Sequence, residues 1–261
     1  MGRYLRDQMI CNIELDLEAI DSICEIVRDR VEKWNSSLTN EQRDGNEISV
    51  CYLIRFDGKG FIVFELEELK KYYEQATNVE RIVINAYNVV LQRQSPAFLE
   101  LSLDTRNDAA CSITASSDDR DWMEASFSNL NEALQKYRTK NGLVRTGWTP
   151  FVVQIFGVFI GFLCAIWAAF EVNKFIKFES PFAVALLFFI LLFSNVWTYV
   201  YPRLLAFIFY VFPNVAFIQR KRASVHWFYQ TIIGSSVFAI VVFCLAKIWS
   251  AVSKYVAGFV I

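Results

Sequence analysis

A run of twenty residues without a charge, Phe151 to Phe170, is the feature that most constrains the fold of this chain. A helix of this length spans about 30 Å, the thickness of the hydrocarbon core of a bilayer. From there to its end the chain is mostly apolar, whereas the residues before Trp148 mix polar and apolar side chains. The sequence therefore predicts a water-soluble domain followed by a membrane domain.

The two parts also differ in charge. Residues 1–148 hold 25 acidic and 18 basic residues, whereas residues 149–261 hold two and eight. Phosphate binding requires a cationic surface, so the acidic first part argues against nucleic acid as a partner. The N-terminus carries charges at Arg3, Arg6 and Asp7 and lacks the apolar stretch of a signal peptide. We therefore expect the soluble domain to be cytoplasmic.

Hydrophobic patterning predicts an α+β domain over residues 1–140. Alternation of apolar and polar residues predicts strands, and apolar residues spaced by three and four predict helices. The expected strands are 10–17, 48–56, 61–66, 80–89, 98–103 and 110–115. The expected helices are 18–34, 67–76 and one that Asp118 caps and that ends near Tyr137, with a polar loop over 35–46. Hairpins imply a mostly antiparallel sheet with the helices on one face.

The last helix of this domain leads directly to the membrane region. Its apolar residues recur with a period of about 3.5, which favours packing on the sheet and leaves contact with another helix in an oligomer as an alternative. A basic linker over 141–150 then joins it to the first span. We therefore expect that a movement of the soluble domain pulls on that span.

Hydropathy predicts that residues 151–261 cross the membrane three times. The expected spans are 151–170, 181–201 and 227–246. The apolar segment 204–218 is interrupted by Pro213 and is short for a crossing, so it is expected to lie at the interface, to re-enter or to extend the second span inside protein.

Charge sets the predicted orientation. The positive-inside rule places the basic cluster Arg220, Lys221 and Arg222 in the cytoplasm together with the approach to the first span. The C-terminus then lies outside. Four crossings, the alternative, would separate these two basic regions.

Small and polar residues mark contacts within the membrane region. Small residues at intervals of four let helix backbones approach closely, either within one chain or between copies: Gly157, Gly161, Ala165 and Ala169. Polar groups at membrane depth are costly in lipid and are expected to face protein or water: Gln154, Asn195, Thr198 and Arg203.

Side chains suited to catalysis are sparse in the sequence. His226, the only histidine, lies beside the predicted third span, so residues 1–148 can hold no histidine triad and no His/Cys zinc site. Glycine-rich phosphate loops are absent, and the six cysteines have no paired spacing. The acidic groups at 104–108 and 118–121 are typical of a solvated loop and a helix start. We expect no enzyme activity, no metal and no cofactor.

Two functions fit these features. In the first, the protein is a membrane sensor–effector whose cytoplasmic domain binds a ligand or protein and alters the integrity or conductance of the membrane. This layout resembles that of microbial membrane effectors that depolarise infected cells, including antiphage systems. In the second, the protein is a membrane-anchored scaffold or subunit that docks a cytoplasmic partner. Both predict a multi-pass protein of the bacterial inner membrane that associates with lipid and with copies of itself or another protein.

Overall fold

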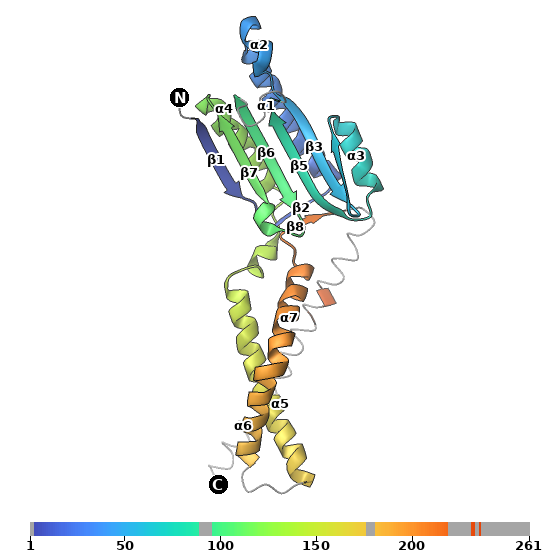
Figure 1. Ribbon diagram of the computed structural model, residues 1–261, viewed down its shortest axis with the longest axis vertical. Coiled ribbons are helices and arrows are strands. Elements are labelled where there is room, and N and C mark those ends of the chain that lie inside the picture. The colour runs from blue at the N-terminus through green and yellow to red at the C-terminus, as the bar shows by residue number, and fades with distance from the viewer. Residues whose placement is uncertain (1–2, 89–95, 176–180, 219–230, 233–234, 236–261) are drawn as a thin grey trace. The chain divides into compact units, whose positions relative to one another are not determined.

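The computed structural model describes residues 3–88, 96–175, 181–218, 231, 232 and 235. Residues 1–218 form one unit by their internal contacts. Figure 1 shows within this unit a sheet domain, which covers residues 3–145, and a pair of antiparallel helical arms, the helical hairpin, which covers 148–211.

The sheet domain is built around a six-stranded sheet in the order β1-β7-β6-β5-β3-β4. Each pair of neighbouring strands is antiparallel, so the predicted α+β class with an antiparallel sheet is confirmed. The strands are β1 (Tyr4–Met9), β3 (Ser49–Phe56), β4 (Lys59–Val63), β5 (Val79–Tyr87), β6 (Ala97–Asp104) and β7 (Ser112–Ser117).

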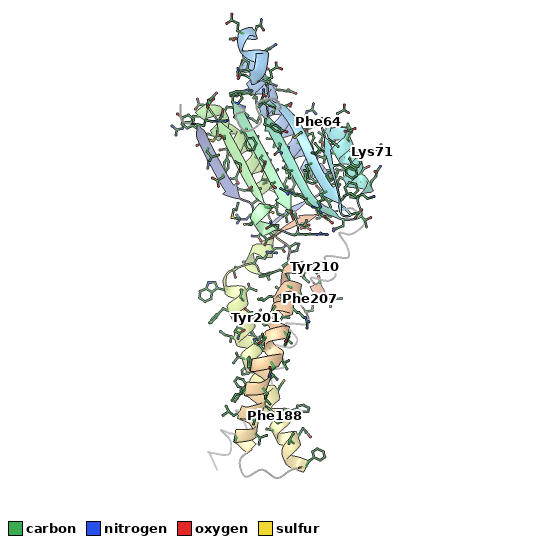
Figure 2. The ribbon with its side chains drawn as sticks, viewed as in Figure 1. Phe64, Lys71, Phe188, Tyr201, Phe207 and Tyr210 are labelled. Carbon is green, nitrogen blue, oxygen red and sulfur yellow. The ribbon has the colours of Figure 1, made fainter. Side chains whose placement is uncertain are left out.

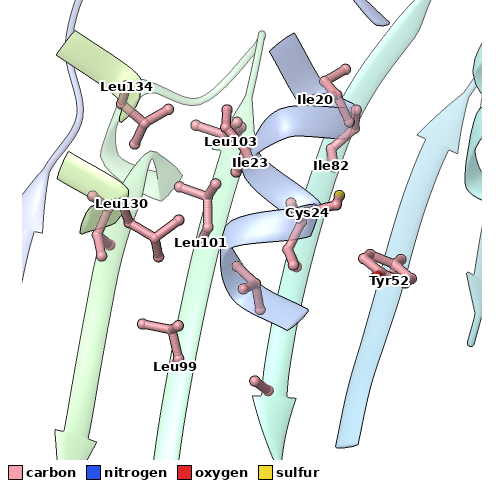
Figure 3. Packing of buried hydrophobic residues seen from close by; sticks show 14 of the residues in the cluster. Ile20, Ile23, Cys24, Tyr52, Ile82, Leu99, Leu101, Leu103, Leu130 and Leu134 are labelled. Atoms are coloured by element: carbon pink, nitrogen blue, oxygen red, sulfur yellow. The ribbon is translucent and has the colours of Figure 1, made fainter. Parts of the chain in front are cut away.

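Helices cover one face of this sheet and form the core with it. They are α1 (Leu17–Ser37), α3 (Leu66–Gln75) and α4 (Arg120–Gln135), and a short α2 (Asn40–Asn46) follows α1. Figure 3 shows the apolar side chains of α1 and α4 facing those of β5 and β6. Leu99, Leu101 and Leu103 alternate along β6 and are almost fully buried, as period-two patterning predicts for strands with one face in the core.

Three local predictions were wrong. The strand expected over 10–17 is interrupted because Asn12 has a φ of 59°, a left-handed conformation that ends regular extension. Only β2 (Ile13–Leu15) remains of it, and the edge strand β1 precedes it. The polar loop expected over 35–46 contains α2, and Asp119 rather than Asp118 caps α4, since its Oδ1 accepts from the backbone nitrogens of the first turn.

The helical hairpin consists of two arms. The first is α5 (Trp148–Phe175), and the second runs from α6 (Pro181–Leu191) through a π turn (Leu192–Val196) into α7 (Trp197–Val211). After α7 a short strand, β8 (Val215–Phe217), pairs with β2 in parallel. Among the described residues, one helix is long and apolar enough to cross a membrane, and it covers Trp148–Ala169.

Candidate functional site

The strand β2 is where the two ends of the helical hairpin meet the sheet domain. On one side it pairs with β8, which follows α7, with Ile13 opposite Val215 and Leu15 opposite Phe217. On its other side, Ile13 forms an antiparallel bridge with Arg138, in the segment that leads from α4 towards α5. We call this junction, made of β2, β8 and the side chains described below, the β2–β8 clamp.

The chain that leaves the sheet domain is bound to β2 through main-chain contacts. The backbone nitrogen of Glu14 donates to the carbonyl of Tyr137 at 3.0 Å, and that of Thr139 donates to the carbonyl of Asn12 at 2.7 Å. Gly142 lies against the side chain of Asn12, where an added Cβ would come within 2.9 Å of Nδ2. A Gly142→Ala substitution would therefore require the side chain of Asn12 to shift.

The chain that returns to the sheet domain is fixed by Asn214. Its Oδ1 accepts from the backbone nitrogen of Asn12 at 2.9 Å, and its Nδ2 donates to the carbonyl of Ile10 at 3.3 Å. Its own carbonyl accepts from the backbone nitrogen of Ile13 at 2.9 Å. Because Asn214 is only 5 % exposed, loss of its side chain leaves the buried carbonyl of Ile10 and the partly buried backbone nitrogen of Asn12 without these partners.

Arg145 joins both ends of the hairpin. Its guanidinium donates from Nη1 to the carbonyls of Phe209 and Phe212, at 3.4 and 3.0 Å, and lies over the ring of Phe209. It also forms an ion pair with Asp108 in the loop between β6 and β7. A positive group at the C-terminus of α7 satisfies its last carbonyls and stabilises its dipole. One side chain before α5 thus holds the end of α7.

Tyr73, on α3, contacts the clamp from within the sheet domain. Its hydroxyl lies 3.3 Å from the carbonyl oxygen of Leu15 and 3.0 Å from that of Ile218, so its single proton is shared between β2 and the residue after β8. The ring of Phe217 packs edge-on against it. Burial raises the pKa of Tyr73, so the hydroxyl remains a donor over the physiological pH range.

The predicted small-residue ridge packs within the chain. A Cβ at Gly157 would overlap the ring of Trp197, and one at Gly161 would come within 2.5 Å of Phe193. Ala165 and Ala169 are buried. In this unit the ridge therefore lies against the second arm, which corresponds to the intramolecular alternative of the sequence prediction.

The predicted polar residues of the hairpin have different surroundings. Gln154 accepts a hydrogen bond at 2.9 Å from Nε1 of Trp197, which joins the two arms. Asn195 in the π turn and Thr198 and Arg203 in α7 are exposed. The basic cluster Arg220, Lys221 and Arg222 and the predicted span 227–246 lie outside the described residues, apart from isolated positions within that span.

The segment predicted over 204–218 is divided between two elements. Residues up to Val211 continue α7 beyond Pro202, and the residues after Asn214 form β8. The described part of this segment therefore extends the second arm and then enters the sheet domain.

The outer surface of the hairpin is exposed and mostly apolar. In the most apolar window of the first arm, only 17 % of the residues are buried. On the second arm Phe207 and Tyr210 are exposed, the latter by 81 % (Figure 2). Contiguous apolar surface of this extent marks a protein or membrane interface rather than a surface that faces water.

Several titratable groups of the sheet domain form ion pairs or lie in the core. The buried carboxylate of Glu80, on β5, pairs with Arg55 of β3 at 3.2 Å and with Arg106 of the loop after β6 at 2.7 Å. Burial raises the pKa of the Cys24 and Cys51 thiols, which disfavours the reactive thiolate. Within the described part of the chain, no group of three His, Cys, Asp or Glu side chains could hold a metal ion.

Sequence reasoning missed the residues of the clamp. Asn214, Val215 and Phe217 were assigned to an interrupted apolar segment, and the role of Arg145 was seen only as part of a basic linker. The signal that could have indicated the strand is the change from a helical pattern to Pro213-Asn214 followed by a β-branched residue. Comparison with protein-family models, curated proteins and solved structures finds no match for this chain.

Proposed function

We propose that this chain is a membrane sensor–effector in which the cytoplasmic sheet domain binds a ligand or protein and the hairpin, placed in the bilayer, changes membrane conductance or integrity. The observation that carries this proposal is the β2–β8 clamp. It binds the chain before α5 and the chain after α7 to the same three-residue strand. A displacement of β2 would therefore move both ends of the hairpin.

The surface of the hairpin supports its placement in lipid. Exposure of its apolar side chains to water would cost about 25 cal/mol for each Å² of apolar area. The first arm has 28 residues and a length of about 42 Å, which exceeds a hydrocarbon core of about 30 Å. Because both arms end at the sheet domain, the proposal puts these ends on one side of the membrane and the opposite ends of the arms, at Phe175 and Pro181, on the other.

The clamp favours this function over a passive scaffold. A scaffold needs only a flexible tether between its docking domain and its anchor. Here the side chains of Arg145, Asn214 and Tyr73 each bond to main-chain groups at the junction. Such a connection constrains the geometry of the hairpin, which a tether does not require. The same layout is the basis for proposing a role as a microbial effector in antiphage defence.

A weakened clamp can replace the unidentified trigger in a test of this function. A ligand acts by shifting an equilibrium between two states, and a substitution that favours one state has the same effect. Cells that express the Asn214→Ala variant should show a membrane potential different from cells with the wild type, measured with a potential-sensitive dye at matched expression. Asn129→Ala is the control, because Asn129 lies on the exposed side of α4, away from the clamp.

A disulfide across the clamp provides the complementary test. Glu14 and Ala216 are directly opposite in the β2–β8 pair, at the strand spacing of about 4.8 Å, which a disulfide can bridge. In the Asn214→Ala background, Glu14→Cys with Ala216→Cys should restore the wild-type potential under oxidising conditions and lose this effect under reduction. A potential that neither the weakened nor the locked clamp alters would refute the proposed function.

A further inference from the structure

We propose that Arg203, on α7, binds the phosphate group of an anionic phospholipid in the leaflet on the side of the sheet domain. This inference deepens the function proposed above and rests on it, because it requires the hairpin to lie in the bilayer. It adds to that function a binding site for a lipid headgroup on the second arm.

Arg203 is an isolated charge on an apolar helix. It is the only charged residue between Pro181 and Val211 in the sequence. Its side chain is exposed, and within the described part of the chain its guanidinium has no hydrogen-bond, ion-pair or ring partner. An arginine at membrane depth is costly unless an acceptor neutralises it. A hairpin in the bilayer therefore needs an anionic group beside Arg203.

A contact between the arms fixes the level of Arg203 in the membrane. The hydroxyl of Tyr201 donates to the carbonyl of Pro150 at 3.2 Å, so Tyr201 lies level with the start of the uncharged run of α5 (Figure 2). Arg203 follows Tyr201 by two residues, about 3 Å further towards the end of α7. With the uncharged run in the hydrocarbon core, Arg203 lies at the level of the lipid phosphates. Trp148, which is 71 % exposed, is typical of the aromatic residues found at this level.

The part of the chain after the sheet domain supplies no carboxylate at this level. It holds two acidic residues, Glu171 and Glu179. Glu171 lies about 30 Å along α5 from Pro150, and Glu179 falls in the sequence between the far ends of the two arms. Residues 180–261 hold six Lys and Arg and no acid, so a second copy packed in parallel would lack the acid too. This basic composition favours the anionic lipid as the partner of Arg203.

The side chains around Arg203 suit a lipid better than a free anion. A guanidinium presents a planar fork of donors that matches two phosphate oxygens. Tyr199 precedes Arg203 by one helical turn, on the membrane side of it, and is 69 % exposed. Its ring offers apolar surface to the acyl chain that continues from a headgroup bound at Arg203.

Native mass spectrometry of the full-length protein in mild detergent tests this site. The wild type should bind phosphatidylglycerol more tightly than phosphatidylcholine, because the choline group offsets the charge of the phosphate. Arg203→Gln should weaken the binding of phosphatidylglycerol roughly tenfold, because a charge-assisted hydrogen bond is lost. Arg203→Lys keeps the charge and should retain the preference for phosphatidylglycerol.

Arg120→Gln is the matched control, because Arg120 is an exposed arginine on α4 and its loss changes the net charge equally. It should leave the binding of phosphatidylglycerol unchanged. Equal weakening in Arg120→Gln and Arg203→Gln, or no weakening in either, would overturn the proposal. Displacement of the lipid by a tenfold excess of inorganic phosphate would also overturn it, because the site would then recognise a free anion.

Extraction of membranes with alkaline carbonate separates a failure of this site from a failure of the proposed function. Insertion depends on the apolar surface of the hairpin, so the wild type and Arg203→Gln should both stay in the membrane pellet. If Arg203→Gln stays there and binds phosphatidylglycerol as the wild type does, the lipid site is refuted and the proposed function stands. Wild-type protein that carbonate removes from the membrane would refute both, because the hairpin would then not lie in the bilayer.

Discussion

The Asn214→Ala substitution tests the energetics of the clamp. The side chain accepts from the backbone nitrogen of Asn12 and donates to the carbonyl of Ile10, which is buried. Its loss leaves both main-chain groups without these partners, and each buried unsatisfied group costs about 1–3 kcal/mol. We expect a total of about 3 kcal/mol, which lowers the melting temperature by roughly 6–12 °C in a protein of this size.

The loss of stability in Asn214→Ala should be concentrated at the clamp rather than spread over the core. Hydrogen exchange of main-chain amides measures this directly, because local opening has its own free energy. The backbone nitrogens of Ile13 and Ile218 donate across the β2–β8 pair. Their exchange should accelerate by roughly 100-fold, whereas amides at the centre of β6 should change much less.

Asn129→Ala is again the matched control, and it should change stability by less than about 0.5 kcal/mol because its side chain is exposed. The reasoning is refuted if the exchange of Ile13 and Ile218 in Asn214→Ala equals that of the wild type. Amide exchange that is faster by the same factor over the whole sheet domain would also contradict the reasoning, because the clamp would then not open separately from the rest of the domain.

Three further predictions follow from the same contacts. Arg145→Lys retains the charge but has one nitrogen in place of the two that bond the carbonyls at the end of α7 and Asp108, so we expect a loss of about 1–2 kcal/mol in urea unfolding. An unchanged midpoint would contradict this. Gly157→Ala should destabilise the hairpin by about 1–3 kcal/mol and change the emission of Trp197, whereas Gly147→Ala, which has open space around it, should not. Burial raises the pKa of Tyr73, so its contribution to stability is complete below about pH 10 and decreases as the pH rises above this value. The loss of stability at alkaline pH should therefore be less steep in Tyr73→Phe than in the wild type. Equal slopes would show that the ionisation of Tyr73 does not contribute.

The sequence predicts much of the sheet domain because its signals are local. Asp57-Gly58 is a turn that both residues favour through positive φ, and Leu99, Leu101 and Leu103 show the alternation of a strand with one buried face. Apolar spacing likewise predicts α1 and α4. The edge strand β1 was missed because all of its residues are exposed and no apolar alternation marks it.

The clamp could not be predicted because it depends on contacts between distant parts of the chain. Asn12 and Asn214 are 202 positions apart, and neither carries a local signal for the other. Because Val215 is apolar, the sequence alone assigns it to a membrane segment. Its place in a strand becomes visible only from its pairing with β2. The role of Gly157 was visible only as a small-residue spacing, and the structure supplies the contact with Trp197.

Labelling from the two sides of the membrane tests the central claim most directly, namely that the hairpin lies in the bilayer with both ends at the sheet domain. Phe175 lies at the far end of α5, and Tyr210 lies at the end of α7 near the clamp; both are highly exposed. In a background with serine at Cys11, Cys164 and Cys244, and in inverted membrane vesicles that expose the cytoplasmic side, an impermeant maleimide should modify Tyr210→Cys at once and Phe175→Cys only after permeabilisation. Equal modification of both sites in sealed vesicles would contradict the claim.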